Sequence, residues 1–240
     1  MTPAVALVFV SHSGLLAQGI VDLCRQMAPT TVMIPAGGLE DGSLGTSFDT
    51  IAAAIERAAG LGDDSEDPLR DVVVLADLGS AVLSTQSVME FLPAELEGRI
   101  TLASAPFVEG GVAAAVSAEG GAPAADVARS AHQAMDSLLS PLSATEHVTP
   151  PGVEGSVSQE VEVLNSLGLH ARPAAVLARL IASFDAHVTL NGADGSSVIE
   201  IMKLGVSGGQ RLVITAQGPQ AEEALTAVVR AITEGFGELA

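Results

Sequence analysis

Aromatic residues are almost missing from this chain of 240 residues, which has no tryptophan, no tyrosine and six phenylalanines. Its cores must therefore be built from the aliphatic side chains that dominate its 48% apolar content. Cysteine is equally scarce, because Cys24 is the only one. No disulfide can form within the chain, which is typical of a protein of the reducing cytoplasm, and we expect that location.

Positive charge is also scarce. Ten Lys and Arg residues stand against 29 Asp and Glu residues, so the formal net charge is −19. Such a chain is repelled by nucleic-acid phosphates and by anionic lipid, and we expect neither as a partner. No apolar run approaches the roughly 20 residues needed to span a bilayer. The apolar segment 4–10 has no basic residue before it, so it predicts a buried strand rather than a signal peptide.

The length favours two domains over one large core. Residues 1–140 alternate short apolar runs with helical periodicity, which predicts an α/β domain with a doubly wound parallel sheet. The expected strands are 4–10, 31–34, 72–76 and 99–102, and the expected helices are 15–27, 47–59, 81–92 and 125–139.

The first expected helix places Cys24 on one apolar stripe with Leu16, Ile20, Leu23 and Met27. This spacing predicts a core position for Cys24 rather than a reactive thiol.

At the start of the second expected helix, Thr46 and Asp49 have the spacing of a capping box.

Residues 141–156 lack apolar periodicity and contain Pro141, Pro150 and Pro151, so we interpret them as an interdomain linker. Residues 157–240 alternate strand and helix patterns of another type. They predict a small α+β domain, in which helices cover one face of an antiparallel sheet.

The segment 168–175, Gly-Leu-His-Ala-Arg-Pro-Ala-Ala, places His170 just before an expected helix. Free amides at a helix N-terminus attract anions, Arg172 offers a fork of donors, and Pro173 is tolerated in the first turn. Neutral imidazole can be a nucleophile near neutral pH. His170 is therefore a candidate phosphohistidine.

Residues 157–240 resemble HPr, the histidine-containing phosphocarrier of the bacterial phosphotransferase system, through this motif and through the segment 197–209. The resemblance implies that Val198, Ile199 and Met202 form a patch on which partners dock, although helical spacing leaves a buried core position open for one of the three. It also places Ser197 where some HPr proteins carry a regulatory serine. The preceding hairpin is about four residues shorter than usual and Ser196 replaces a usual lysine, so we expect Ser197 to cap a short helix.

A second histidine, His12, follows the first expected strand and precedes the first expected helix, and Asp77 follows the third strand. Ligands of open α/β sheets gather at this edge, so the two side chains are expected to meet. A carboxylate on one ring nitrogen would fix the tautomer and leave the other nitrogen free to attack. No Lys or Arg lies nearby in sequence, so the hydroxyls of Ser13 and Ser80 are the expected phosphate donors.

The segments 10–13, 45–48, 76–82 and 105–110 together resemble the phosphotransfer subunit of dihydroxyacetone kinase, a relative of the mannose-class enzyme IIA domain. The resemblance covers residues 2–140. It implies phosphorylation of His12 supported by Asp77, and a homodimer formed through this domain.

The two resemblances imply a phosphotransferase that relays a phosphoryl group from phosphoenolpyruvate and Enzyme I to His170, then to His12. The final acceptor would be ADP on the nucleotide-binding subunit of dihydroxyacetone kinase, and Enzyme I would be a separate protein. Two alternatives stay open: a component of mannose-class sugar uptake, and a regulatory phosphoprotein module. No cofactor is expected, since the chain has no Walker-type glycine loop and no cluster with metal-ligand spacing.

Overall fold

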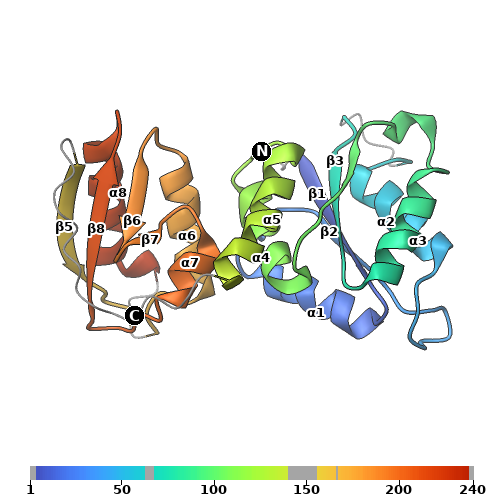
Figure 1. Ribbon diagram of the computed structural model, residues 1–240, viewed down its shortest axis with the longest axis horizontal. Coiled ribbons are helices and arrows are strands. Elements are labelled where there is room, and N and C mark those ends of the chain that lie inside the picture. Colours follow the sequence, from blue (N-terminus) through green and yellow to red (C-terminus); the bar gives the residue numbers. More distant parts are fainter. Residues whose placement is uncertain (1–3, 63–67, 140–155, 166, 238–240) are drawn as a thin grey trace. The chain divides into compact units, whose positions relative to one another are not determined.

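The computed structural model describes residues 4–62, 68–139, 156–165 and 167–237 (Figure 1). The chain divides into two compact units, residues 1–138 and 139–240, which are described separately as the N-terminal and C-terminal units. Except for Ser156, the expected linker lies outside the described residues.

The N-terminal unit contains a four-stranded parallel sheet in the order β2-β1-β3-β4. Its strands are β1 (Val5–Ser11), β2 (Met33–Gly37), β3 (Asp71–Ala76) and β4 (Ile100–Leu102). The reversal of strand order at β1 is typical of a doubly wound sheet, and it places the carboxyl ends of β1 and β3 side by side.

Helices cover both faces of this sheet (Figure 1), as the sequence predicts. Alternate residues of β1, from Ala6 to Val10, pack against α2 and α3, while Phe9 faces the side of α1 and α4. The helices are α1 (Gly14–Arg25), α2 (Phe48–Ala59), α3 (Gly79–Met89), α4 (Phe107–Glu119) and α5 (Ala124–Leu139), with a short 3₁₀ turn at Ala94–Leu96.

Helix α4 is absent from the sequence-based expectation. Its buried residues spread over most of the helix surface, so it shows no narrow apolar stripe, and Gly110 and Gly111 lower its helix propensity. The ring of Phe9 packs so closely that a Cβ on Gly111 would lie 2.7 Å from it. Glycine at this position lets α4 approach the sheet.

Strand β2 begins two residues later than expected. The amides and hydroxyls of Thr30 and Thr31 donate to the carboxylate of Glu119, which holds this segment as a loop. The strand can then include Pro35, because β2 is an edge strand with one unpaired side.

The buried face of α1 differs in part from the one that the sequence predicts. Cys24 is buried as expected, but its neighbours on the buried face of α1 are Ala17, Ile20 and Val21, while Leu16 and Leu23 are exposed.

Helix α2 is capped by Ser47, whose hydroxyl accepts from the Thr50 amide, so the expected capping box is wrong.

The C-terminal unit is an antiparallel sheet in the order β5-β8-β6-β7, with helices on one face, as expected. Along β8, buried Leu212, Ile214 and Ala216 alternate with more exposed residues. The elements are β5 (Ser156–Glu162), α6 (Ala171–Ala182), β6 (His187–Leu190), β7 (Ala193–Asp194), α7 (Val198–Lys203), β8 (Arg211–Gln217) and α8 (Ala221–Thr233), followed by a 3₁₀ turn at Gly235–Gly237.

Candidate functional site

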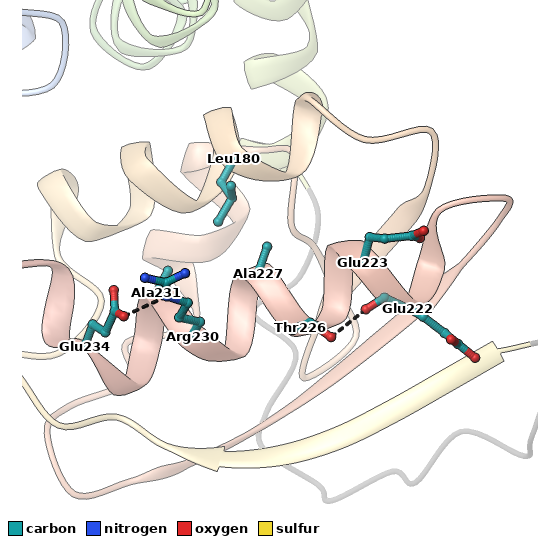
Figure 2. Close-up of a pocket in the computed structure, with 8 residues that line it drawn as sticks. All are labelled: Leu180, Glu222, Glu223, Thr226, Ala227, Arg230, Ala231 and Glu234. Carbon is teal, nitrogen blue, oxygen red and sulfur yellow. Dashed lines mark hydrogen bonds and ion pairs between the residues drawn. The ribbon is translucent and has the colours of Figure 1, made fainter.

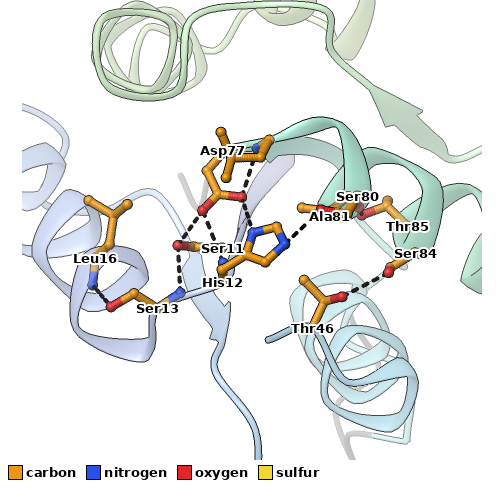
Figure 3. Close-up of polar contacts among 11 residues, drawn as sticks. Ser11, His12, Ser13, Leu16, Thr46, Asp77, Ser80, Ala81, Ser84 and Thr85 are labelled. Carbon is orange, nitrogen blue, oxygen red and sulfur yellow. Dashed lines mark hydrogen bonds and ion pairs between the residues drawn. The ribbon is translucent and has the colours of Figure 1, made fainter. Parts of the chain in front are cut away.

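His12 and Asp77 meet at the carboxyl edge of the parallel sheet. His12 follows β1 and Asp77 follows β3, and the register pairs Val10 with Ala76 just before them. The ring Nδ1 of His12 lies 2.9 Å from Asp77 Oδ1 (Figure 3). The His12 side chain is 26% exposed, so the ring is supported by the protein and still open to a partner. The structure brings together the pair that the sequence predicts.

Asp77 receives four hydrogen bonds from its surroundings. Its Oδ2 accepts from the Ser11 hydroxyl at 2.8 Å and from the His12 amide at 3.0 Å, while Oδ1 accepts from the Leu78 amide at 2.7 Å as well as from the His12 ring. Burial alone would raise the pKa of Asp77, but the donors of His12 and Ser11 outweigh it and hold that pKa below its ordinary value. Asp77 is therefore an ionised acceptor at neutral pH.

The second ring nitrogen of His12 faces α3. Because an ionised carboxylate can only accept, Nδ1 carries a proton, and in the neutral ring Nε2 carries the lone pair. Ser80 Oγ lies 2.8 Å from Nε2 and can donate to it (Figure 3). Ser80 stands in the first turn of α3, where amides lack intrahelical partners. A phosphoryl group on Nε2 would therefore meet the Ser80 hydroxyl and the start of a helix.

Ser13 has a mainly local role. Its hydroxyl caps α1 by accepting from the Leu16 amide at 3.2 Å, and its own amide donates to Ser11 Oγ at 3.0 Å. The hydroxyl proton of Ser13 is not used in these contacts, and its expected role as a phosphate donor stays a prediction.

Ser11 is the residue of this site that sequence reasoning missed. It is fully buried at the end of β1, and its hydroxyl links the Asp77 carboxylate to the Ser13 amide (Figure 3). The available signal was a serine that ends an otherwise apolar strand, since a buried hydroxyl requires partners.

The loop between β2 and α2 closes over the backbone of the site. The amide of Gly45 donates to the His12 carbonyl at 2.9 Å, and Thr46 and Ser84 share a hydrogen bond of 2.8 Å that joins the loop to α3. A Cβ on Gly37 would lie 2.7 Å from the Ser13 carbonyl oxygen, so β2 also needs a glycine here. These contacts fix the loop beside His12.

The C-terminal unit presents His170 as the N-cap residue of α6, with Arg172 exposed in the first turn and Pro173 buried. The preceding turn depends on Gly168, whose φ is +69° and whose Cβ would collide with the Val206 carbonyl oxygen. The buried side-chain amide of Asn165 donates to the Gly168 carbonyl and closes the turn. The helix starts where the sequence predicts, and it offers free amides beside His170.

The structure of α7 contradicts the expected docking patch at Val198, Ile199 and Met202. Val198 and Ile199 are only 3% and 4% exposed, because this short helix packs them inward, and the helix lies against α6. Of the three side chains expected to form a docking patch, only Met202 keeps partial exposure. Ser197 caps α7 by accepting from the Glu200 amide at 3.3 Å, which agrees with its expected capping role.

Among the described residues, we also searched for metal ligands, a reactive thiol and a membrane-spanning helix. These residues contain no group of three or more His, Cys, Asp or Glu residues placed to hold a metal ion. Burial raises the pKa of the Cys24 thiol to about 12, so Cys24 is inert. In the same described part of the chain, no helix is long and apolar enough to cross a membrane.

A shallow groove between α6 and α8 carries three glutamates and one arginine (Figure 2). Arg230 is paired with Glu234 at 2.7 Å. The excess of carboxylates makes this groove unsuited to a phosphate.

Comparisons with known proteins agree with the two-unit structure. Residues 6–128 match the family profile described as the PTS system fructose IIA component, and residues 157–234 match the one described as the PTS HPr component phosphorylation site. Phosphocarrier protein NPr of Escherichia coli K12 is 43% identical over 88 residues, which are 35% of this chain and 98% of that protein.

Two relatives extend over both units. The protein named PEP-dependent dihydroxyacetone kinase, phosphoryl donor subunit DhaM, from Escherichia coli K12 is 36% identical over 251 residues. Its counterpart in Providencia stuartii is 32% identical over 249 residues. The alignments cover 98% of this chain and 51% and 50% of these relatives, so the chain spans about half of their length.

The fused order of the two profiles and the His12–Asp77 and His170 sites lead to one assignment. The chain belongs to the family of PTS system fructose IIA components, and it carries an HPr phosphocarrier domain behind the IIA domain in one polypeptide.

Proposed function

We propose that this protein relays a phosphoryl group from His170 to His12 as a phosphotransferase component. The observation that carries the proposal is the His12 ring, with Nδ1 held by Asp77 and Nε2 directed to Ser80 at the partly exposed sheet edge. A structural histidine would not need a part-buried carboxylate with four donors to set its tautomer.

The chemistry balances without an added proton acceptor. In the donor, one ring nitrogen of His170 is bonded to phosphorus and the other carries a proton. When Nε2 of His12 attacks, the P–N bond to His170 breaks, and His170 leaves as neutral imidazole. His12 then carries the phosphoryl group on Nε2 and keeps its proton on Nδ1, where the Asp77 carboxylate balances the positive ring.

Each site stabilises the phosphoryl oxygens in its own way. At His170 the donors are Arg172 and the first amides of α6. At His12 they are the Ser80 and Ser13 hydroxyls and the first amides of α3. Little other chemistry is needed, because phosphoryl transfer depends mainly on positioning and charge stabilisation.

The names of the DhaM relatives support the proposed donor to His170 and the proposed acceptor from His12. They describe a phosphoryl donor subunit of a PEP-dependent dihydroxyacetone kinase. We therefore assign Enzyme I as the donor to His170, and ADP on the nucleotide-binding subunit of that kinase as the acceptor from His12. A cytoplasmic location and a homodimer through the N-terminal unit belong to the same proposal, and sedimentation would test the dimer.

Counting phosphates by intact mass tests the relay. After incubation with phosphoenolpyruvate and Enzyme I, the wild-type chain should accept two phosphates, His12→Ala one and His170→Ala none. Labelling of His12 in the His170→Ala chain would contradict the order of transfer. Addition of the ADP-loaded kinase subunit should then remove the phosphate from His12, and retention with every acceptor present would favour a regulatory phosphoprotein instead.

A further inference from the structure

One buried amide in the loop before His170 is only half satisfied. Asn165 lies between β5 and α6 and is 2% exposed. Among the buried side-chain nitrogen and oxygen atoms of the described residues, its Oδ1 alone has no hydrogen-bond partner. A buried acceptor without a partner lowers stability, and such atoms are rare in folded proteins. The amide therefore contributes something at this position that an apolar side chain would not.

The nitrogen end of the amide explains its presence. Nδ2 of Asn165 donates to the carbonyl oxygen of Gly168, a residue that is also buried. Only the NH₂ group can face a carbonyl oxygen, so this bond fixes which way the amide points and directs Oδ1 elsewhere. The Gly168 amide in turn donates to the Asn165 carbonyl at 2.9 Å. Asn165 thus closes the turn with both its backbone and its side chain.

The peptide group between Gly168 and Leu169 is held at both ends. Its carbonyl accepts from the Asn165 side chain, and its amide, on Leu169, donates to the Val206 carbonyl at 2.9 Å. Leu169 is only 3% exposed, so its side chain is anchored in the core as well. A peptide plane that is bonded at both ends cannot rotate freely. The backbone therefore enters His170 in one direction.

The position of the His170 ring depends on this direction. His170 is the N-cap residue of α6 and has an extended backbone, with φ −72° and ψ −176°. The first amides of α6 and Arg172 are the proposed donors to a phosphoryl group on the ring. The helix sets the position of these donors, whereas the preceding turn sets the position of the ring. A displacement of about 1 Å between reacting groups can slow a reaction about 100-fold.

We propose that Asn165 is a positioning residue for His170, whose side chain holds the Gly168–Leu169 peptide so that a phosphoryl group on the ring meets the first amides of α6. The inference rests on the proposed phosphorylation of His170 and adds the residue that presents this histidine. The unpaired Oδ1 then has a reason, because an amide cannot supply its donor without its acceptor. An apolar residue would remove the unpaired acceptor and lose the hold on the Gly168 carbonyl. Such a conflict between stability and geometry is typical of functional sites.

Phosphorylation of the full-length chain by Enzyme I tests this role. The parent is the His12→Ala chain, in which His170 is the proposed acceptor, and intact mass follows its labelling at about pH 8. Asn165→Asp keeps the shape of the side chain but replaces the donor by an ionised acceptor, and Asn165→Ala removes the donor without adding charge. Each should lower kcat about 10-fold and leave KM within about twofold, because the ring is displaced while the surface that Enzyme I meets is unchanged.

Asn191→Asp is the matched control in the same unit. Asn191 also closes a turn with its side chain, but there Oδ1 accepts from the Val213 amide at 2.8 Å, and a carboxylate can accept in the same way. The φ of Asn191 is +48°, which aspartate tolerates. The substitution adds the same charge as Asn165→Asp. It should leave kcat within about twofold of the parent.

Amide hydrogen exchange at Leu169 reports on the peptide group without any phosphoryl donor. In both Asn165 variants the bond from the Leu169 amide to the Val206 carbonyl should open more often, so exchange at Leu169 should accelerate at least about 10-fold. Amides in the middle of α6 should exchange at the parent rate, because the helix itself is intact. This readout separates a local release of the turn from a general loss of stability.

The combined outcomes decide the proposal. Slow phosphorylation together with fast exchange confined to the turn at Leu169 would support it. Phosphorylation of both Asn165 variants at the parent rate, unchanged exchange at Leu169, or equal slowing by Asn191→Asp would overturn it and leave the relay intact. Faster exchange throughout the C-terminal unit would also overturn it, since the variants would then be generally unstable. A parent chain that accepts no phosphate on His170 would overturn the proposed relay itself.

Discussion

The two histidines are prepared for phosphoryl transfer in opposite ways. At His12 both ring nitrogens have side-chain partners, Asp77 and Ser80, and no basic residue lies in the surrounding segments. His170 occupies the N-cap position of α6, and an exposed arginine follows two residues later. The first site fixes the tautomer of its nucleophile, and the second supplies positive charge. The two sites therefore prepare a histidine for phosphoryl transfer by different physical means.

Loss of the Asp77 carboxylate should have the largest effect of any change at these two sites. Asp77→Asn keeps the shape of the side chain, but its amide can donate to Nδ1 of His12 and favour the tautomer whose Nε2 is protonated and cannot attack. Transfer from His170 to His12 should slow by at least about 100-fold. The measurement is the single-turnover rate from a His170-phosphorylated donor chain to the variant.

The same Asp77→Asn chain serves as its own control. Enzyme I should still label His170 at the wild-type rate, because that histidine lies in the other unit. Equal loss of labelling at both histidines would contradict a local role for Asp77.

The sequence alone predicted that His12 and Asp77 lie next to each other. Parallel strands end at a common edge, so a histidine after β1 and an aspartate after β3 had to be neighbours once the strand order was that of a doubly wound sheet. The segment before α6 was equally informative, since its helix start and arginine follow from local sequence.

Other features depend on tertiary packing and were not predictable from local patterns. Helix α4 is buried over most of its surface, so it lacks the periodicity by which a helix is recognised. Ser11 acquires its role only when β3 brings Asp77 beside it. The inward direction of Val198 and Ile199 depends on how a six-residue helix packs on α6.

Removal of the positive charge at His170 should have the next largest effect. Arg172→Ala should slow phosphorylation of His170 by Enzyme I about 10-fold, because the fork of donors to the phosphoryl oxygens is lost. Arg172→Lys keeps the charge and should recover only part of the rate. Rapid-quench labelling measures both, and a full recovery by lysine would mean that charge alone, without the bidentate geometry, is sufficient.

Replacement of Ser11 should slow transfer to His12 by less, and it should act specifically on Asp77. Ser11→Ala removes one of the four donors to Asp77, so the pKa of Asp77 should rise, and transfer to His12 should slow several-fold. Carbon-13 NMR of the Asp77 carboxyl group reports this pKa directly. A purely structural role for Ser11 would lower stability without moving the Asp77 titration, and Ser130→Ala provides a control hydroxyl in the same unit, far from Asp77 in sequence.

The smallest expected effect is on stability against pH. The pKa of folded Asp77 lies below its ordinary value of 3.8, so ionised Asp77 stabilises the N-terminal unit above about pH 4, and this contribution is lost as the pH falls through the folded pKa. The difference in unfolding free energy between wild type and Asp77→Asn should therefore shrink from pH 5 to pH 3. Urea unfolding followed by circular dichroism, with the transitions of the two units fitted separately, measures it. A difference that stays constant over this range would show that the hydrogen bonds to Asp77 stabilise its neutral form equally well, and His12 would then owe its orientation to packing rather than to a charged partner.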